Sequence, residues 1–431
     1  MEYDIIIIGS GISGLYAAYI IRNQRPDLSF LVLEKHKKQW IGGRASNETF
    51  YGTELATGAG IGRKQDKLLK HLQRELGFEI KEFKSVPEYS KLEEPIDILK
   101  VMAFLRGKYQ KYRGPSTTFE KFAKPLLGQE VYDRFLYSAG YRDFEKEDVH
   151  DTLYNYGMED NACCLTGFGV HWRKTILALA AKIGESNIKF SQNVVGISGE
   201  DGRFLVHMEN GRDYCCKKII VATTITSLRK FFPERPIYRE IEGQPFLRIY
   251  GKFAKQSIPI MKEYMKRYIC VPGPIQKMIA MNPDEGVYMI VYNDNKNALK
   301  LKDRTENTKE NCVFYCGMIE RALGIPRGRL DLIGIRSYYW AVGTHFYKPL
   351  SVESGQSGSC KPLSVESGQS GSRVPLDQEN YKTREEFIDE AQHPEDGILV
   401  VGEVVSKHQG WVEGALESVK AALTKKWVEN I

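Results

Sequence analysis

The first 34 residues contain the pattern that most constrains the fold. An apolar run over residues 4–8 leads into a glycine-rich turn and a helical stretch, and a second apolar run over residues 30–33 ends at Glu34. The turn has three glycines at positions 1, 3 and 6 of its motif: Gly9, Gly11 and Gly14. Such glycines allow a tight turn, a close approach of backbone to a pyrophosphate, and close packing of helix on sheet. A carboxylate at the position of Glu34 can accept hydrogen bonds from ribose hydroxyls. The sequence therefore predicts a dinucleotide-binding α/β unit.

Composition narrows the class of protein further. The chain has 431 residues, which predicts two joined domains, and a net charge of +6 with scattered lysines, which argues against nucleic acid as a partner. The first residues show neither the basic nor the apolar region of a secretory signal, so we expect none, and no apolar run is long enough for a membrane span. The eight cysteines lack paired zinc-ligand spacing, so we expect no metal site, reduced thiols and a cytoplasmic location.

The dinucleotide domain is expected to be assembled from separated parts of the chain. Buried-type strands at 218–223 and 397–401 and a final helix from residue 410 belong with the N-terminal unit. Helical spacing is seen at 67–76, 96–105, 119–127 and 131–136, and a hairpin at 194–208. The predicted division is 1–84, 161–235 and 391–431 for the dinucleotide domain, with 85–160 and 236–390 forming a second domain. Strands are expected in the latter at 246–253, 287–292 and 332–340.

One internal repeat interrupts the second domain. Residues 348–360 are followed by residues 361–373, which are identical except for the last residue. The period is too short and too rich in serine and glycine for a solenoid unit, so we interpret it as a duplication in a flexible loop. A docking segment is the alternative.

Several motifs taken together resemble one enzyme family. They are the N-terminal fingerprint with Glu34, Gly42-Gly43-Arg44, Gly402-Glu403, and residues 410–415 around Trp411. In this order they are similar to the FAD-dependent amine oxidases, which include monoamine and polyamine oxidases. The resemblance implies a Rossmann-like, doubly wound FAD-binding domain interleaved with an α+β substrate domain.

The resemblance also implies which residues hold FAD. The pyrophosphate and ribose contacts would come from Gly9, Ser10, Gly11, Ser13, Gly14, Glu34, Lys35, Gly43 and Arg44. Residues Gly58, Ala59, Gly60 and Ile61 would run along the flavin, and Val194 or Val195 would meet the adenine. Gly402 and Glu403 would lie near the ribityl chain, and Trp411 and Val412 would open a helix whose N-terminus points at the flavin.

The implied reaction is oxidation of an amine to an imine by hydride transfer to FAD, with dioxygen reoxidising the cofactor to give hydrogen peroxide. The family lines its site with two aromatic residues, here matched by Trp411 and by Phe346, with Tyr347 or Trp340 as alternatives. His345 is expected to be a structural, hydrogen-bonded histidine.

Two features depart from the family pattern. Monoamine oxidases attach FAD through a cysteine in the Gly-x-x-aromatic stretch, but no cysteine occurs between Leu330 and Ser359, so we predict non-covalent FAD. The family's oxidases also use a lysine that holds a water near the flavin. Lys252 and Lys255, in the matching stretch 248–255, are the candidates.

Other readings stay open at this stage. The same fold also serves desaturases and protoporphyrinogen-oxidase-like enzymes with large apolar substrates, and a weakly active flavoprotein with an interaction role is a third reading. The amine is not specified. Acids could line a substrate entrance or form a solvated face: Glu145, Glu147, Asp148 and Asp151. The expected partners are a small amine and dioxygen, and a homodimer is possible.

Overall fold

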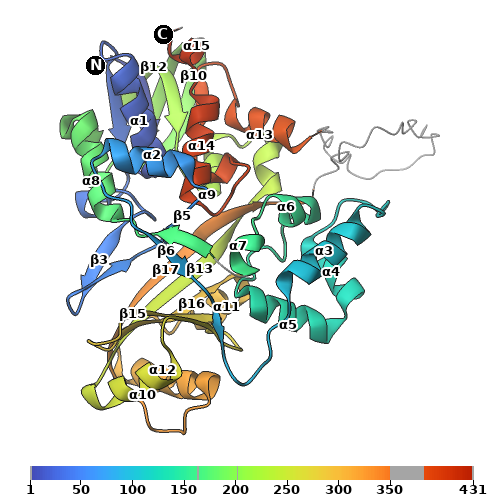
Figure 1. The fold of residues 1–431 in the computed structure, drawn as a ribbon. Coiled ribbons are helices and arrows are strands. Elements are labelled where there is room, and N and C mark those ends of the chain that lie inside the picture. Colours follow the sequence, from blue (N-terminus) through green and yellow to red (C-terminus); the bar gives the residue numbers. More distant parts are fainter. Residues whose placement is uncertain (1, 163–164, 201, 350–382, 430–431) are drawn as a thin grey trace.

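The computed structural model describes residues 2–162, 165–200, 202–349 and 383–429. The duplicated segment 348–373 therefore lies outside the described residues, apart from its first two positions. The described residues form two lobes, with one large sheet in each (Figure 1).

The upper lobe in Figure 1 is built on a seven-stranded sheet that draws on three separated parts of the chain. Its order is β10 (Val194–Glu200), β11 (Arg203–Met208), β12 (Asp213–Val221), β1 (Glu2–Ile8), β2 (Phe30–Leu33) and β9 (Ile188–Lys189), with β18 (Ile398–Val400) paired to β12. The pairs that join β9, β2, β1, β12 and β18 are parallel, whereas β10, β11 and β12 are antiparallel. The predicted α/β class is confirmed.

The run of four isoleucines in β1 shows why this sheet is covered on both faces. Successive side chains of a strand point to opposite faces. Ile5 and Ile7 pack in one apolar cluster, and Ile6 and Ile8 pack in the other. The first cluster contains side chains of α1 (Ile12–Gln24), α2 (Lys67–Glu75), α8 (Trp172–Ile183) and α14 (Val412–Ala422). The second contains side chains of α9 (Ile225–Phe231) and α13 (Arg384–Gln392), and α15 (Lys425–Glu429) ends the described chain.

The lower lobe has a six-stranded sheet. Its order is β17 (Leu332–Tyr347), β13 (Ile241–Phe253), β16 (Val287–Asp294), β15 (Lys277–Asn282), β14 (Tyr268–Cys270) and β7 (Glu88–Tyr89). Its apolar cluster includes residues of α10 (Ile258–Tyr264), α11 (Asn295–Leu301) and α12 (Lys309–Leu323). A separate cluster holds α3 (Ile98–Tyr109), α4 (Phe119–Leu127), α5 (Gln129–Ala139) and α6 (Val149–Tyr154), beside α7 (Glu159–Ala162). Small sheets pair β3 (Asn47–Phe50) with β4 (Thr53–Ala56), and β8 (Leu165–Phe168) with β5 (Gly62–Arg63) and β6 (Glu82–Ser85).

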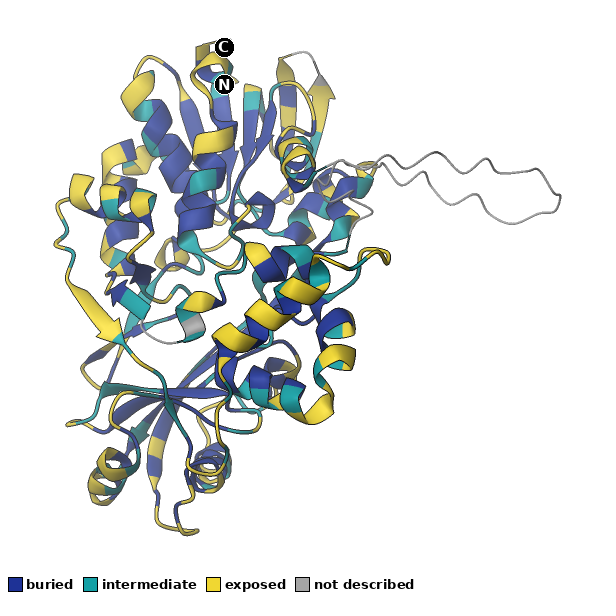
Figure 2. Ribbon diagram, turned by 45° about the vertical axis from the view of Figure 1, so that its right-hand side comes forward, coloured by how far each residue is buried: buried dark blue, intermediate teal, exposed yellow. Residues whose placement is uncertain are grey.

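Two long strands join the lobes. β13 begins at Ile241 in a core cluster of the upper lobe and ends at Phe253 in that of the lower lobe, and β17 runs back antiparallel to it. Both strands are longer than the sequence pattern predicts because they pair with each other far beyond the predicted ends. Residues 246–251 of β13 are all buried, whereas residues 339–344 of β17 are half-buried or exposed; Figure 2 colours the described chain by this burial.

No described helix is long and apolar enough to cross a bilayer.

The close packing of α1 on the glycine turn generates a stability prediction. A Cβ added at Gly14 would lie 2.0 Å from the carbonyl oxygen of Gly9, which is backbone and cannot rotate away. We expect Gly14→Ala to lower the free energy of unfolding by about 2 kcal/mol or more, because the helix must shift away from the turn. Thermal unfolding followed by circular dichroism measures the effect.

Gly107 provides the matched control. It also lies inside a helix, α3, but an added Cβ would meet no atom within 4 Å. Gly107→Ala should stabilise the protein slightly, by about 0.5–1 kcal/mol, through helix propensity alone. A Gly14→Ala variant that unfolds at the same temperature as Gly107→Ala would contradict the packing argument.

Candidate active site

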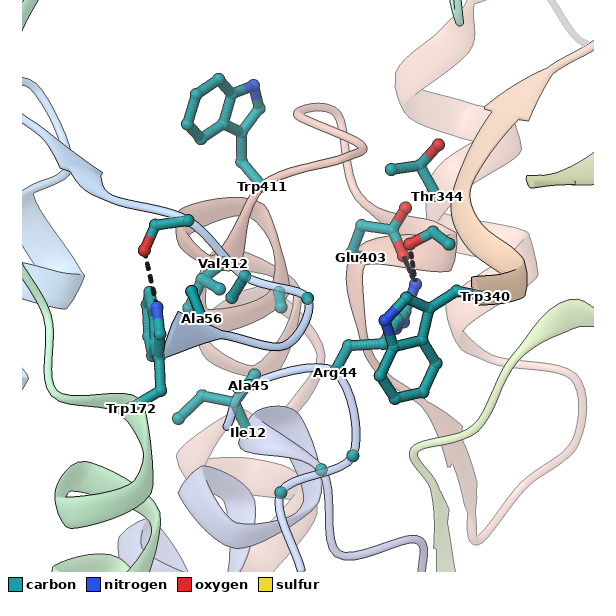
Figure 3. Close-up of a pocket in the computed structure, with 18 of the residues that line it drawn as sticks. Ile12, Arg44, Ala45, Ala56, Trp172, Trp340, Thr344, Glu403, Trp411 and Val412 are labelled. Atoms are coloured by element: carbon teal, nitrogen blue, oxygen red, sulfur yellow. Dashed lines mark hydrogen bonds and ion pairs between the residues drawn. The ribbon is translucent and has the colours of Figure 1, made fainter. Parts of the chain in front are cut away.

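A large cleft opens at the carboxyl ends of the parallel strands and continues between the two lobes. Its volume is about 1550 Å³. Residues that directly follow β1, β2, β12 and β18 line it, among them Gly9, Glu34, Thr223 and Gly402. In open α/β sheets, ligands bind at this edge. Figure 3 shows Ile12 and Val412 from α1 and α14 on the wall of this cleft, together with Trp172, Trp340 and Trp411.

The glycine turn is shaped to admit a ligand closely. Gly9 has φ +106°, and an added Cβ would lie 2.5 Å from the carbonyl oxygen of Ala222. Gly11, in contrast, has no atom within 4 Å of its added Cβ, so the backbone is open on the cleft side. Ser10 and Gly14 of the same turn do not line the cleft: Ser10 is fully buried, and Gly14 packs on Gly9. Ser10 and Gly14 therefore contribute to the packing of the turn, and their position does not support the predicted contacts with a pyrophosphate.

Glu34 ties the turn to the end of β2. Its Oε2 accepts hydrogen bonds from the backbone N–H and the hydroxyl of Ser10, at 2.9 and 2.8 Å. Its Oε1 accepts from the backbone N–H of His36 at 2.9 Å. The carboxylate is buried but still lines the cleft beside Lys35, where the sequence predicts the ribose contact.

Glu403 joins three segments that are far apart in the sequence. Its carboxylate accepts hydrogen bonds from the backbone N–H of His345 at 2.7 Å, from the N–H of Gly410 at 3.1 Å and from Arg44 Nη1 at 3.2 Å. The ring nitrogen Nδ1 of His345 lies 2.8 Å from Oε2. Burial by itself raises the pKa of Glu403, but His345 and Arg44 lower it well below its usual range. Figure 3 shows Arg44 and Glu403 side by side, and Arg44 also donates to the carbonyl oxygen of Gly343 at 2.7 Å.

Aromatic rings close the part of the cleft between the lobes. Trp340 of β17 donates its indole N–H to the carbonyl oxygen of Thr57 at 2.8 Å, so its position is fixed. The ring of Trp411 is covered by the guanidinium of Arg63, 3.9 Å from the ring centroid. Phe246 and Tyr292 add further ring surface, with their centroids 5.2 Å apart.

Comparisons with known proteins agree with this geometry. Residues 7–76 match the family described as NAD(P)-binding Rossmann-like domain. A search of curated proteins finds no match. Cyclohexylamine oxidase from Brevibacterium oxydans is similar in structure, with a TM-score of 0.72 and 14% identity over 100% of this chain and 99% of that chain. A triple mutant of putrescine oxidase, from a redesign of its cofactor binding, has a TM-score of 0.71 and 14% identity over 98% of both chains.

This chain has the amine oxidase fold. Within that fold, most residues that the resemblance assigns to the cofactor line the one cleft: Gly9, Gly11, Ser13, Glu34, Lys35, Gly43, Arg44, Gly58, Ala59, Gly60, Ile61, Val194, Val195, Gly402, Glu403, Trp411 and Val412. Their contacts with a cofactor stay predictions.

The cleft wall has unused hydrogen-bonding capacity that a dinucleotide could satisfy. Among the described residues, buried polar atoms without a partner include Gln192 Oε1, Thr223 Oγ1, Thr344 Oγ1 and Gln409 Oε1, all in residues that line the cleft. Buried polar groups are normally paired. Together with the open backbone at Gly11, they fit a ligand rich in hydroxyl and phosphate oxygens.

The aromatic prediction for β17 needs correction. Phe346 and Tyr347 are buried but do not line the cleft. Phe346 lies two residues beyond Thr344, about 7 Å further along the strand, and has left the cleft wall. Tyr347 faces the core, where it packs on Phe387 and donates to the carbonyl oxygen of Ser406. Trp340, the alternative, is the β17 aromatic residue in the cleft.

The lysine prediction is also wrong in placement. Lys252 is on β13, but it lies four residues, or about 13 Å, beyond the cleft-lining Arg248, and it pairs with Glu285. Lys255 lies past the end of the strand and is exposed. The cations that line the inter-lobe part of the cleft are instead Arg248 and Lys277. The sequence signal for both is weak, because β13 also carries Lys252 and because Lys277 begins β15, a strand without a motif.

The four acids of residues 145–151 form neither an entrance nor a solvated face. Glu145, Glu147, Asp148 and Asp151 are all buried and do not line the cleft. Asp151 pairs with Arg384 at 2.7 Å, which links α6 to α13. Burial raises the pKa of Glu147 well above its usual range. His345 is the hydrogen-bonded structural histidine that the sequence predicts.

The Glu403 junction leads to a pH-dependent prediction. We expect Glu403→Gln to lower the free energy of unfolding by about 3 kcal/mol at pH 7, because the Arg44 guanidinium and the buried backbone N–H of His345 lose the negative charge that accepts from them. The folded pKa lies below the ordinary value of 4.5, so the stabilisation is fully present above that value and is lost as the pH falls below it. The difference in free energy of unfolding between wild type and Glu403→Gln, measured by urea unfolding, should therefore become smaller below about pH 4.5.

Glu185→Gln is the control, because Glu185 forms an exposed ion pair with Lys38. The free energy of unfolding of that variant should match that of wild type across the pH range. A Glu403→Gln gap that stays constant down to acid pH would contradict the assignment of the depressed pKa to this carboxylate.

Proposed function

We propose that this protein is an FAD-dependent oxidoreductase that oxidises an amine to an imine, with dioxygen as the electron acceptor and hydrogen peroxide as a product. The observation that carries the proposal is the likeness of essentially the whole chain to cyclohexylamine oxidase and putrescine oxidase, combined with one continuous cleft from the glycine turn to the aromatic chamber. The NAD(P)-binding description of residues 7–76 supports a dinucleotide but does not separate FAD from NAD(P).

The residues of the upper lobe would hold the cofactor. The open backbone at Gly11 and Gly43 would face the diphosphate, and Arg44, fixed by Glu403, would supply positive charge beside it. Residues 58–61 line the cleft further along. When bound, FAD supplies a hydride acceptor for the carbon beside the amine nitrogen.

The chain itself would prepare the amine. A free amine with a pKa of about 10.4 must lose a proton first, which costs about 4.6 kcal/mol at pH 7. A chamber walled by Trp340, Trp411 and Phe246 lowers that cost, because an apolar environment disfavours the ammonium form. The N-terminus of α14 lines the cleft at Val412, and its dipole favours negative charge there.

We propose that FAD is held without a covalent bond. Thr344 lies in the stretch where monoamine oxidases carry their cysteine, and among the described residues no cysteine lines the cleft. The described cysteines are all free thiols, which supports a cytoplasmic location. A homodimer stays a prediction.

The chamber argues against a purely apolar substrate. The buried Arg248 and Lys277 and the half-buried Asp143 line it beside the aromatic rings, and such charged groups do not suit a large hydrocarbon-like molecule. This favours an amine over the substrates of the desaturase-like alternative. The repeat that supports an interaction role lies outside the described residues.

The state of the cofactor can be tested by acid precipitation. The purified protein should be yellow with the visible absorption of oxidised flavin, and precipitation with acid should leave that colour in the supernatant. A yellow pellet would contradict non-covalent binding. A colourless folded protein that binds NAD(P)H but no FAD would contradict the cofactor assignment.

The reaction can be tested without oxygen. Anaerobic addition of amines should bleach the oxidised flavin, and admission of air should restore its absorbance with release of hydrogen peroxide. Trp340→Leu should slow the bleaching by about tenfold or more, because it opens the chamber to water. Phe346→Leu is the control and should leave the rate near wild type, since Phe346 does not line the cleft. If no amine of a broad panel reduces the flavin, the proposed amine oxidation is contradicted.

A further inference from the structure

Three neighbouring strands place two cations on either side of one tyrosine. In the sheet register, Tyr292 of β16 pairs with Arg248 of β13 on one side and with Lys277 of β15 on the other. The Arg248 guanidinium lies 4.7 Å from the Tyr292 ring centroid, and the Lys277 ammonium lies 4.5 Å from it. The Lys277 ammonium also lies against the ring of Tyr141, 2.8 Å from its centroid. All four residues line the cleft.

Both cations are buried without a carboxylate partner. Arg248 is 3% exposed and Lys277 is 1% exposed. Within the described part of the chain, no carboxylate oxygen lies within 4.0 Å of either charged group. Arg248 makes long hydrogen bonds to the carbonyl oxygens of Ala56 and Ala59 at 3.4 and 3.5 Å and to the Tyr292 hydroxyl at 3.3 Å, and it also interacts with the Tyr250 hydroxyl. Its Nε has no partner.

The nearby acids are engaged elsewhere. Asp143 accepts a hydrogen bond from the Tyr156 hydroxyl at 2.6 Å. Asp294 accepts from the backbone N–H of Arg142 at 3.0 Å and from Gln276 Nε2 at 3.4 Å. Buried charges are normally paired, because an unpaired ion loses its hydration without compensation. A pair of unpaired cations on the wall of a cleft therefore indicates an anionic ligand.

We infer that the substrate is an amine that also carries a carboxylate, the chemical class of the amino acids, and that Arg248 and Lys277 bind this carboxylate beside Tyr292. This inference rests on the proposed function and names its substrate class. A planar guanidinium is the side chain best suited to a carboxylate. Burial lowers the pKa of Lys277 to about 7, although Cys270, Asp294 and Asp143 act in the opposite direction. A bound anion would favour the protonated lysine.

The inference separates this chain from its structural neighbours in substrate. A diamine such as putrescine is a dication at neutral pH, and two buried cations repel it. The cofactor is the other possible source of negative charge, since the Arg248 Nη2 lies 3.5 Å from an added Cβ on Gly60, in the stretch 58–61 that the sequence predicts along the flavin. The experiment must therefore distinguish substrate from cofactor.

Pairs of ligands that differ only by a carboxylate test the inference. The purified holoprotein is titrated by calorimetry with benzoate, and then with L-phenylalanine against phenethylamine and L-ornithine against putrescine. We expect each carboxylate-bearing member to bind about tenfold more tightly than its amine, or better. Equal or weaker binding of the carboxylate-bearing members would overturn the inference, and this comparison needs no variant.

Variants identify the residues responsible. Arg248→Met should weaken benzoate and L-phenylalanine binding by about tenfold or more and leave phenethylamine within about threefold. Arg248→Lys should restore part of the affinity for these two ligands. Lys277→Met, like Arg248→Met, should weaken the binding of benzoate and L-phenylalanine. Lys252→Met is the matched control on β13 and should leave the affinity for both kinds of ligand unchanged, because Lys252 lies outside the cleft.

Two outcomes separate this inference from the proposed function. If Arg248→Met shifts the flavin reduction potential or weakens FAD retention but leaves carboxylate binding unchanged, the cation serves the cofactor and the inference is wrong. If amines are oxidised with no preference for a carboxylate, the function stands and the inference fails. If benzoate binds tightly through Arg248 but no amine is oxidised, carboxylate binding at Arg248 and Lys277 is supported and the proposed amine oxidation is contradicted.

Discussion

The Glu403 carboxylate is the contact on which the geometry of the cleft depends. It binds Arg44 from the N-terminal segment, the backbone and ring of His345 from β17, and the N–H of Gly410 just before α14. Arg44 lies 359 residues from Glu403 in the sequence and His345 lies 58 residues from it, and each segment contributes to the wall of the cleft. Because the carboxylate is buried and its partners donate from three directions, the loss of its charge would release all three segments together.

The two long strands β13 and β17 fix the geometry of the lower half of the cleft. β13 and β17 pass from one core cluster to the other, and at the middle of β13 Leu247 and Ile249 pack in the lower core whereas Phe246 and Arg248 do not. Phe246 and Trp340 are opposite each other in the register at this point, and Arg248 follows two residues later. Strand alternation therefore aims Phe246 and Arg248 at the same side, into the chamber. The sheet thus presents aromatic surface and positive charge together.

The sequence predicts best where function depends on backbone shape. The turn at Gly9, Gly11 and Gly14 is recognisable because no other residue type fits the approach distances at Gly9 and Gly14. The strands and helices around it follow from local apolar patterns. Glu34 lines the cleft, and its contact with a ribose stays a prediction. Its hydrogen bonds to Ser10 could not be foreseen, because they depend on how the turn folds back on β2.

The side chains of the chamber are harder to predict. The choice between Phe346 and Trp340, and between Lys252 and Arg248, depends on where each strand enters and leaves the cleft. A motif fixes the strand, but a shift of two residues moves a side chain about 7 Å. Lys277 lies on a strand with no motif at all and reaches the site only through the register of β15 with β16. The acids at 145–151 illustrate the same limit, since only the packing of α6 shows them to be buried.

A crystal structure of the purified protein tests the central claim most directly. The account predicts electron density for FAD in the cleft, with the diphosphate at Gly11 and Gly43 and the isoalloxazine between residues 58–61 and the N-terminus of α14. Density for a nicotinamide dinucleotide in that position, or an isoalloxazine remote from Trp340 and Trp411, would contradict it.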